Sequence, residues 1–194
     1  MKLALNTSEL VQRKNVQYDS AFTLTPGEYH LKFVVRENET GRLGSFETDL
    51  VIPDFKSIAV KMSSVVLAGQ LRPSNKKKSD NPMVRDGSEV IPSVTHVFSA
   101  GQHLYFYYEV YDPGRSNGAV RVLTSVSFFR GKTKAYETPA ISSDQLNAPE
   151  RRAAVFQLDV PLTQLKPGFY TCQVNVIDDA AGQFRFPRLA LLVR

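Results

Sequence analysis

The segment LKPGFYTCQVNVIDDAAG (residues 165–182) repeats the pattern of LTPGEYHLKFVVRENETG (residues 24–41), which lies 141 residues earlier in the chain. Both contain a Pro-Gly pair, a Tyr two residues after that Gly, and a closing Gly at the same spacing. The Pro-Gly pair predicts a tight turn. The tyrosine is expected to open the next strand, with its ring inward and its hydroxyl bonded back to the backbone of the turn. The residues assigned to these two structural corners are Leu24, Pro26, Gly27, Tyr29, Leu165, Pro167, Gly168 and Tyr170.

The strands after both corners show the two-residue period of a half-buried antiparallel strand. Tyr29 begins one such run and Tyr170 begins the other, in which Cys172 falls on the inward phase. A strand opened by a hydrogen-bonded tyrosine is typical of immunoglobulin-like sandwiches. Further strands are expected at 46–52, 58–67, 94–98, 103–111, 120–129, 153–160 and 184–193. Many short strands with regular turns predict an all-β, immunoglobulin/fibronectin III-like β-sandwich.

The repeat predicts two tandem domains, with a boundary near residue 56. Residues 57–194 form a complete immunoglobulin-like sandwich with a long loop at 69–92, and residues 1–56 form only the closing strands of a first sandwich. The first corner is preceded by 23 residues, too few for the opening strands. Such a partial sandwich has unpaired strand edges, which predicts a protein partner or self-association through residues 1–56. The favoured explanation is that the chain is a fragment of a longer protein; the alternative is that residues 1–56 add strands to the second domain.

Composition and charge limit the classes of partner. The net charge of +5 includes a cluster of three lysines, Lys76, Lys77 and Lys78, within a polar segment. A nucleic-acid groove needs basic residues spread along one face with stacking aromatics, so no nucleic-acid binding is expected. No apolar run approaches the length of a membrane helix, so no membrane insertion is expected, and the N-terminal residues do not read as a signal peptide.

Three blocks of the sequence resemble the C-terminal part of the von Willebrand factor A-related proteins that are abundant in acidobacteria. These blocks are 24–55, 91–113 and 165–194, and the last is the most specific. The resemblance implies an exported, extracytoplasmic protein with an adhesion or interaction role. The metal-binding loop of the A domain, Asp-x-Ser-x-Ser, does not occur here; the nearest run, Asp86-Gly87-Ser88-Glu89-Val90, lacks the second Ser. Metal-dependent adhesion is therefore not carried over to this chain.

The sequence contains no recognisable catalytic constellation, and we predict neither an enzyme, nor a cofactor, nor a metal site. Of its three histidines, His30 and His103 fall on the outward phase of their strands, and none has metal-ligand spacing. Cys172 is expected to be buried as a small hydrophobe, with no nucleophilic role.

The strand HLYFYYEVYD (103–112) offers the best candidate binding surface. One face carries Leu104 and other core residues, and the opposite face carries His103, Tyr105, Tyr107, Glu109 and Tyr111. A row of tyrosines can stack sugar rings or anchor a protein. The alternative is that this face is covered, by the 69–92 segment or by the neighbouring domain, although Glu109 among the tyrosines favours a wet surface. The candidate binding residues are His103, Tyr105, Tyr107 and Tyr111, with Lys76, Lys77 and Lys78 on the long loop.

These observations predict a non-catalytic structural or protein-interaction module of an exported bacterial protein. The alternative function is carbohydrate binding through the tyrosine face of residues 103–112.

Overall fold

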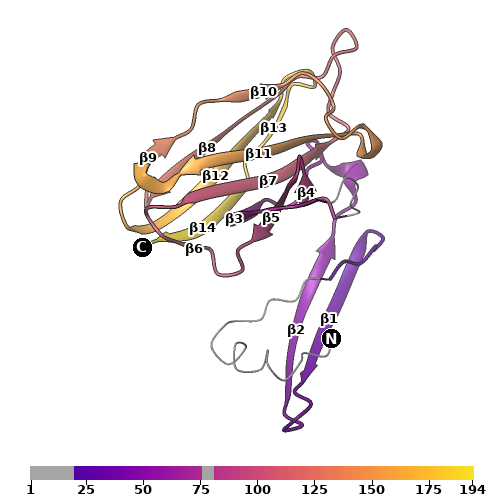
Figure 1. The fold of residues 1–194 in the computed structure, drawn as a ribbon. Helices are drawn as coiled ribbons and strands as arrows, with labels where there is room; N and C mark the ends of the chain where they lie inside the picture. The colour runs from indigo at the N-terminus through magenta and orange to yellow at the C-terminus, as the bar shows by residue number, and fades with distance from the viewer. Residues whose placement is uncertain (1–19, 76–80) are drawn as a thin grey trace. The chain divides into compact units, whose positions relative to one another are not determined.

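The computed structural model describes residues 20–75 and 81–194. The chain divides into two compact units, Met1–Lys56 and Ser57–Arg194. Its described secondary structure consists of β-strands and three short 3₁₀ helices, Phe55–Ser57, Pro149–Arg151 and Leu162–Gln164, so the protein is all-β as predicted (Figure 1). Within the described residues, no helix has the length and apolar character needed to cross a membrane.

The described part of the first unit is a single β-hairpin. Strands β1 (Gly27–Arg36) and β2 (Leu43–Ile52) pair antiparallel over their whole length, with Gly27 opposite Ile52 and Arg36 opposite Leu43. These two strands make a sheet of their own. A two-stranded hairpin alone is only marginally stable in water, so the stability of this hairpin depends on what covers it.

The second unit is a β-sandwich of two sheets. One has the order β11-β7-β3-β5-β4; the other has the order β10-β8-β12-β14-β6, with β9 beside β8 and β13 beside β12. The strand bounds are β3 Val66–Pro73, β4 Val84–Arg85, β5 Ser88–Pro92, β6 Val97–Phe98, β7 His103–Tyr111, β8 Val122–Arg130, β9 Thr133–Glu137, β10 Ile141–Ser143, β11 Ala153–Pro161, β12 Gly168–Asp178, β13 Gln183–Arg185 and β14 Arg188–Val193.

The connections between the sheets are those of the immunoglobulin class. The chain passes from β7 in one sheet to β8 in the other, and again from β11 to β12, which produces the Greek-key arrangement. All ladders are antiparallel except the short β6–β14 ladder, which is parallel. The sandwich therefore belongs to the immunoglobulin/fibronectin III-like class expected from the sequence.

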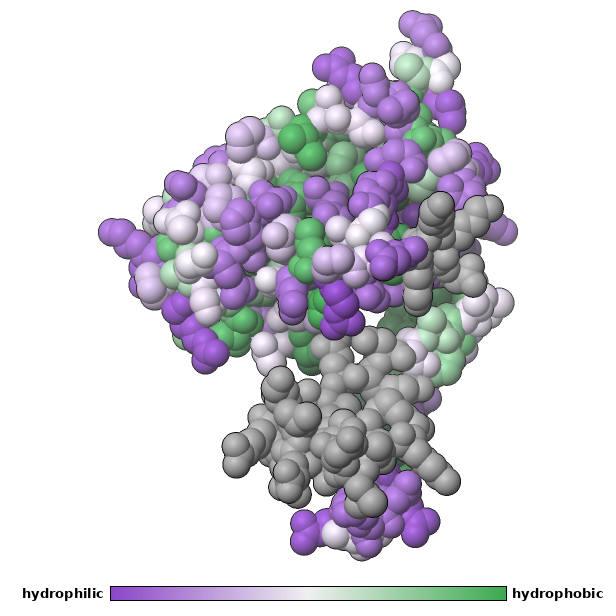
Figure 2. Space-filling view, in the orientation of Figure 1, coloured by the Kyte–Doolittle hydropathy of each residue, from purple (hydrophilic) through white to green (hydrophobic). Residues whose placement is uncertain are grey.

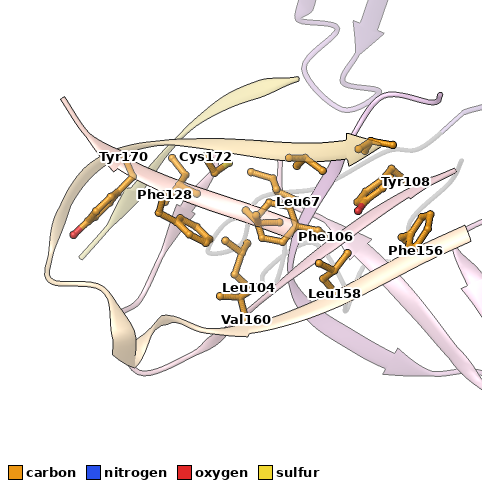
Figure 3. Packing of buried hydrophobic residues seen from close by; sticks show 14 of the residues in the cluster. Leu67, Leu104, Phe106, Tyr108, Phe128, Phe156, Leu158, Val160, Tyr170 and Cys172 are labelled. Atoms are coloured by element: carbon orange, nitrogen blue, oxygen red, sulfur yellow. The ribbon is translucent and has the colours of Figure 1, made fainter. Parts of the chain in front are cut away.

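The core lies between the two sheets and is built by the alternation of the strands. Every inward residue of β7 is fully buried, as are Cys172, Val174 and Val176 of β12. Figure 3 shows Leu104 and Phe106 in the interior with Phe128 and Cys172, and Tyr108 beside Phe156. On the face visible in Figure 2, hydrophilic residues are interspersed with smaller apolar areas. Burial of this continuous apolar layer is the main stabilising contribution to the unit.

The structure corrects the prediction for the segment before β7. The strand expected at 58–67 begins only at Val66 and extends to Pro73, with a bulge between Ala68 and Gln70. The expected long loop at 69–92 therefore contains the end of β3 together with β4 and β5. The apolar run that suggested an earlier strand is instead an irregular segment, in which Val60 and Met62 are buried in the core.

Candidate interaction surface

The β1–β2 hairpin has an apolar face and a second face that carries its charged side chains together with the exposed Val34, Leu43 and Val51. The register places Tyr29 opposite Leu50, Phe33 opposite Phe46, and Val35 opposite Gly44. These residues and Leu31 form one face, which we call the apolar hairpin face. The rings of Phe33 and Phe46 lie with their centroids 6.4 Å apart. Successive residues of a strand point to opposite sides, so the charged residues of both strands share the other face.

The corners of the two units make the same hydrogen bond. The Tyr29 hydroxyl donates to the Thr25 carbonyl oxygen at 2.9 Å, and the Tyr170 hydroxyl donates to the Lys166 carbonyl oxygen at 2.7 Å. The glycines before the tyrosines, Gly27 and Gly168, have φ values of +156° and +151°. This backbone region is rarely open to residues with a side chain, which explains why both corners use Gly.

The two hairpins also share one register. Gly27 pairs with Ile52 as Gly168 pairs with Val193, so a single offset of 141 residues relates both strands of one hairpin to both strands of the other. The offset persists near the hairpin tip, where Val35 pairs with Gly44 and Val176 with Arg185. The closing glycines, Gly41 and Gly182, have φ values of +72° and +64°. The β1–β2 hairpin is therefore built like the last two strands of an immunoglobulin-like sandwich.

The environments of the two hairpins differ. In the second unit the equivalent face is covered by the facing sheet, and Val174 and Val176 are 0% exposed. Their counterparts in the first unit, Phe33 and Val35, are 41% and 70% exposed, and Phe46 is 63% exposed. Isolated exposed apolar residues are ordinary, whereas these residues lie in a contiguous row on one sheet face.

The charged hairpin face contains a compact ion-pair network. His30 contacts Asp49 through Nδ1 at 2.7 Å and Glu47 through Nε2 at 3.1 Å, and Lys32 Nζ lies 2.5 Å from Glu47. Asp49 and then Glu47 raise the pKa of His30 above its ordinary value. Lys32, followed by His30, lowers the pKa of Glu47. All these groups are solvent-exposed, so the network organises the charges of this face and adds little to stability.

The predicted tyrosine surface of β7 is mostly covered. Leu104 and its inward neighbours are in the core as expected, but Tyr107 and Glu109 on the opposite face are each 2% exposed. Tyr107 belongs to a second hydrophobic cluster, separate from the main core, which also contains Val90. Tyr105 and Tyr111 are half-buried against this cluster. The prediction that Tyr107 is available to a ligand is therefore wrong, and the alternative of a covered face is confirmed for it.

Glu109 can lie beneath this covering layer because Tyr107 and Arg151 bind its carboxylate. The Tyr107 hydroxyl donates to Glu109 Oε1 at 2.5 Å, and the Arg151 guanidinium binds both carboxylate oxygens, at 3.0 and 3.1 Å. Burial, followed by the hydrogen bond to Glu109, raises the pKa of Tyr107, and burial raises the pKa of Tyr111 to about 12. Glu109, which the sequence suggested was wet, is a buried carboxylate neutralised by Arg151.

The covering layer comes partly from the segment that was expected to be a loop. Leu71, Met83 and Val90 pack in the cluster around Tyr107. Arg85 reaches across to the Asn147 carbonyl oxygen at 2.9 Å, and Asn147 holds the backbone of Val155 through both its amide atoms. Lys76, Lys77 and Lys78 lie outside the described residues.

The remaining binding candidate of β7, His103, is exposed but already paired. Its Nδ1 lies 2.5 Å from Asp159 Oδ1 on the neighbouring strand β11, and its ring stacks on Tyr105 with centroids 6.2 Å apart. His103 and Tyr105 are thus together at one end of the strand, while Tyr111 is at the other. The structure does not assemble the four predicted residues into one surface.

The structure contains a polar pocket that the sequence did not predict. Its volume is about 410 Å³, and it is lined by Arg85, Asp86, Ser88, Asn147, Val155 and Gln157. Arg85 donates through Nε to Asp86 as well as binding Asn147, so its charge is already engaged. These residues come from two segments, 85–88 and 147–157, that are 59 positions apart at their nearest ends (147 − 88), and no local pattern could have joined them.

Cys172 is buried, as its phase predicted. Its Sγ lies 3.4 Å from the Leu189 carbonyl oxygen, and burial raises the pKa of the thiol to about 12. A protonated, enclosed thiol is a packing residue. Among the described residues, no group of three or more His, Cys, Asp or Glu side chains could hold a metal ion.

Comparisons with known proteins add little. The sequence matches no family model, and no curated protein matches it. Among solved structures it is similar to a β-glucosidase from Listeria innocua, determined in complex with glucose, at 12% identity and a TM-score of 0.34. The match covers 69% of this chain and 16% of that one, so the chain spans a small part of that enzyme.

Proposed function

We propose that the chain is a non-catalytic structural or protein-interaction module of an exported bacterial protein, and that the β1–β2 hairpin is its contact surface. The observation that carries this proposal is the exposure of the apolar hairpin face, which includes Phe33, Val35 and Phe46. The equivalent β12 residues of the second unit, Cys172, Val174 and Val176, are 0% exposed, so we infer that the same construction requires a cover. The extracytoplasmic setting rests on the resemblance to the von Willebrand factor A-related proteins.

The second unit supports a structural role. Its core is continuous, and every buried side-chain polar atom among the described residues has a hydrogen-bond partner. Glu109, its most buried carboxylate, is held by Tyr107 and Arg151 in a way that stabilises the fold. Such a unit acts as a rigid support for a neighbouring contact surface.

The proposal is tested by sedimentation velocity and by binding of the hydrophobic dye ANS, both on the full chain. We expect the wild type either to associate above its monomer mass of 21.7 kDa or to bind ANS. The double variant Phe33→Ser/Phe46→Ser removes two exposed rings and should reduce both signals. The matched control is Phe184→Ser/Phe186→Ser, which removes two exposed rings of the second unit. A strictly monomeric chain that binds no ANS would refute the proposal.

A further inference from the structure

We propose that β1 accepts a β-strand donated by a separate polypeptide, in the antiparallel register that β8 adopts on β12. The inference rests on the proposed function and specifies the partner: a strand with alternating apolar residues and acidic residues between them. The 141-residue correspondence supplies the geometry, because β12 is the counterpart of β1 and its outer edge is occupied by β8.

The outer edge of β1 has backbone groups ready for such a strand. The Glu37 N–H donates to the Arg42 carbonyl oxygen at 2.9 Å, so Glu37 points toward the second strand of the hairpin. Antiparallel ladders alternate, which directs the odd-numbered residues of β1 toward β2 and leaves His30, Lys32 and Val34 at the other edge. Among the described residues, β1 pairs with β2 alone. An open edge of this kind is a template for strand addition.

The counterpart hairpin confirms this direction of alternation. Val174, the counterpart of Phe33, donates its N–H to the Pro187 carbonyl oxygen, on the side of β14. The carbonyl oxygen of Asn175, the counterpart of Val34, accepts a hydrogen bond from the Thr124 hydroxyl of β8 at 2.7 Å, so the backbone of Asn175 is directed toward β8, where it pairs with Ser125. The equivalent edge of β12 is therefore paired with β8, in the way that we propose for β1 and a donated strand.

The size of the apolar hairpin face argues for a strand donor over a second copy packed face to face. Two ten-residue strands, each about 33 Å long and about 5 Å apart, present roughly 300 Å². A stable interface needs about 800 Å² per partner. A partner that occupies the edge of β1 and also covers the face gains backbone hydrogen bonds together with apolar burial, as the rest of the sandwich does for β12.

Charge and register define the donated strand. On β8 the inward residues Val126 and Phe128 lie opposite Val174 and Cys172, so the donor needs apolar residues opposite Phe33 and Leu31. Between them, Ser127 lies opposite Gln173, whose counterpart is Lys32. An acidic residue at this donor position would face the Lys32 ammonium from the side opposite Glu47, which already contacts it. Opposite charges in directly paired positions favour pairing by about two- to fivefold in affinity.

The probes are three fluorescein-labelled peptides that copy β8, residues 122–130. In one, Ser127 is changed to Glu; in the second, Ser127 is changed to Lys; the third has the residues of the first in scrambled order. We expect the full chain to bind the Glu peptide, to bind the Lys peptide about two- to fivefold more weakly, and not to bind the scrambled peptide. In amide exchange, the Glu peptide should slow exchange at His30, Lys32 and Val34.

Two variants of Lys32 separate the backbone edge from the charge. Lys32→Pro removes an N–H from the outer edge without removing a β1–β2 hydrogen bond. It should weaken binding of the Glu peptide by about tenfold. Lys32→Ala keeps the N–H, and should bind the Glu and Lys peptides equally. NMR spectra of the second unit serve as the folding control for both variants.

The proposal is overturned if the Glu peptide does not bind, if Lys32→Pro binds it as well as the wild type, or if exchange slows only along β12. If the peptides fail while the Phe33→Ser/Phe46→Ser variant still loses association or ANS binding, strand addition is wrong and the proposed contact surface remains. If both experiments fail, the proposed function fails as well.

Discussion

Replacing Tyr170 by Phe removes a single hydroxyl from the corner of the second sandwich. Tyr170 is 4% exposed, and its hydroxyl donates to the Lys166 carbonyl oxygen at 2.7 Å. Loss of such a bond costs about 0.5–1.5 kcal/mol, and a carbonyl left without its partner adds to that cost. The ring still packs in the core, so no cavity forms. We expect the free energy of unfolding to fall by about 1–2 kcal/mol.

Urea unfolding of the full chain, followed by far-UV circular dichroism, measures this change. The midpoint should fall while the slope stays the same, because the variant exposes the same surface on unfolding. The matched control is Tyr105→Phe, since the Tyr105 hydroxyl lacks a hydrogen-bond partner within the described residues. Tyr29→Phe removes the equivalent bond from the first unit and should leave this transition unchanged. If Tyr170→Phe stays within about 0.5 kcal/mol of wild type, the corner bond does not stabilise the sandwich.

Three further predictions concern single groups. Arg151→Ala leaves the buried Glu109 carboxylate without its cation and should lower unfolding free energy by about 2 kcal/mol in the same urea assay; Glu109→Gln in that background should recover part of it. Cys172 should react with a thiol reagent only at the rate of unfolding, because burial raises its pKa to about 12; rapid labelling of the folded chain would contradict its burial. His30 should titrate above its ordinary pKa by NMR, and Asp49→Asn should lower that pKa. Because the folded pKa is raised, protonation of His30 favours the hairpin at low pH, and this contribution is lost as pH rises through the folded value.

Local patterns predicted the parts of the fold that depend on local chemistry. The Pro-Gly-Tyr spacing located both corners, and strict alternation located β7 and β12 with the correct inward residues. These signals work because a strand with one face in the core must alternate, and because a turn that needs an unusual φ must use Gly.

The sequence failed where burial depends on distant segments. Glu109 among tyrosines suggested a wet surface, because the residue that neutralises it, Arg151, lies 42 positions away. The segment 69–92 looked like a loop, because β4 and β5 are short and half-buried, without a long alternating run. Neither the Glu109–Arg151 ion pair nor the packing of β4 and β5 is indicated by the neighbouring sequence. The sequence therefore could not show whether the outer face of the β7 sheet is covered or open.

The shared register of the two hairpins has a consequence for how the chain folds. During folding, β8 meets two acceptor strands of the same backbone geometry, β12 and β1, and the chain must choose between them. If β8 paired with β1, β12 would be left without this neighbour. The chain would then be held in a misassembled state, a kinetic trap of the kind that tandem repeats produce. β8 pairs more favourably with β12, because there Val126 and Phe128 are 0% exposed beneath the facing sheet, whereas the described part of the first unit has only its two-stranded sheet. The facing sheet that buries β8 on β12 thus also protects the second sandwich from misassembly.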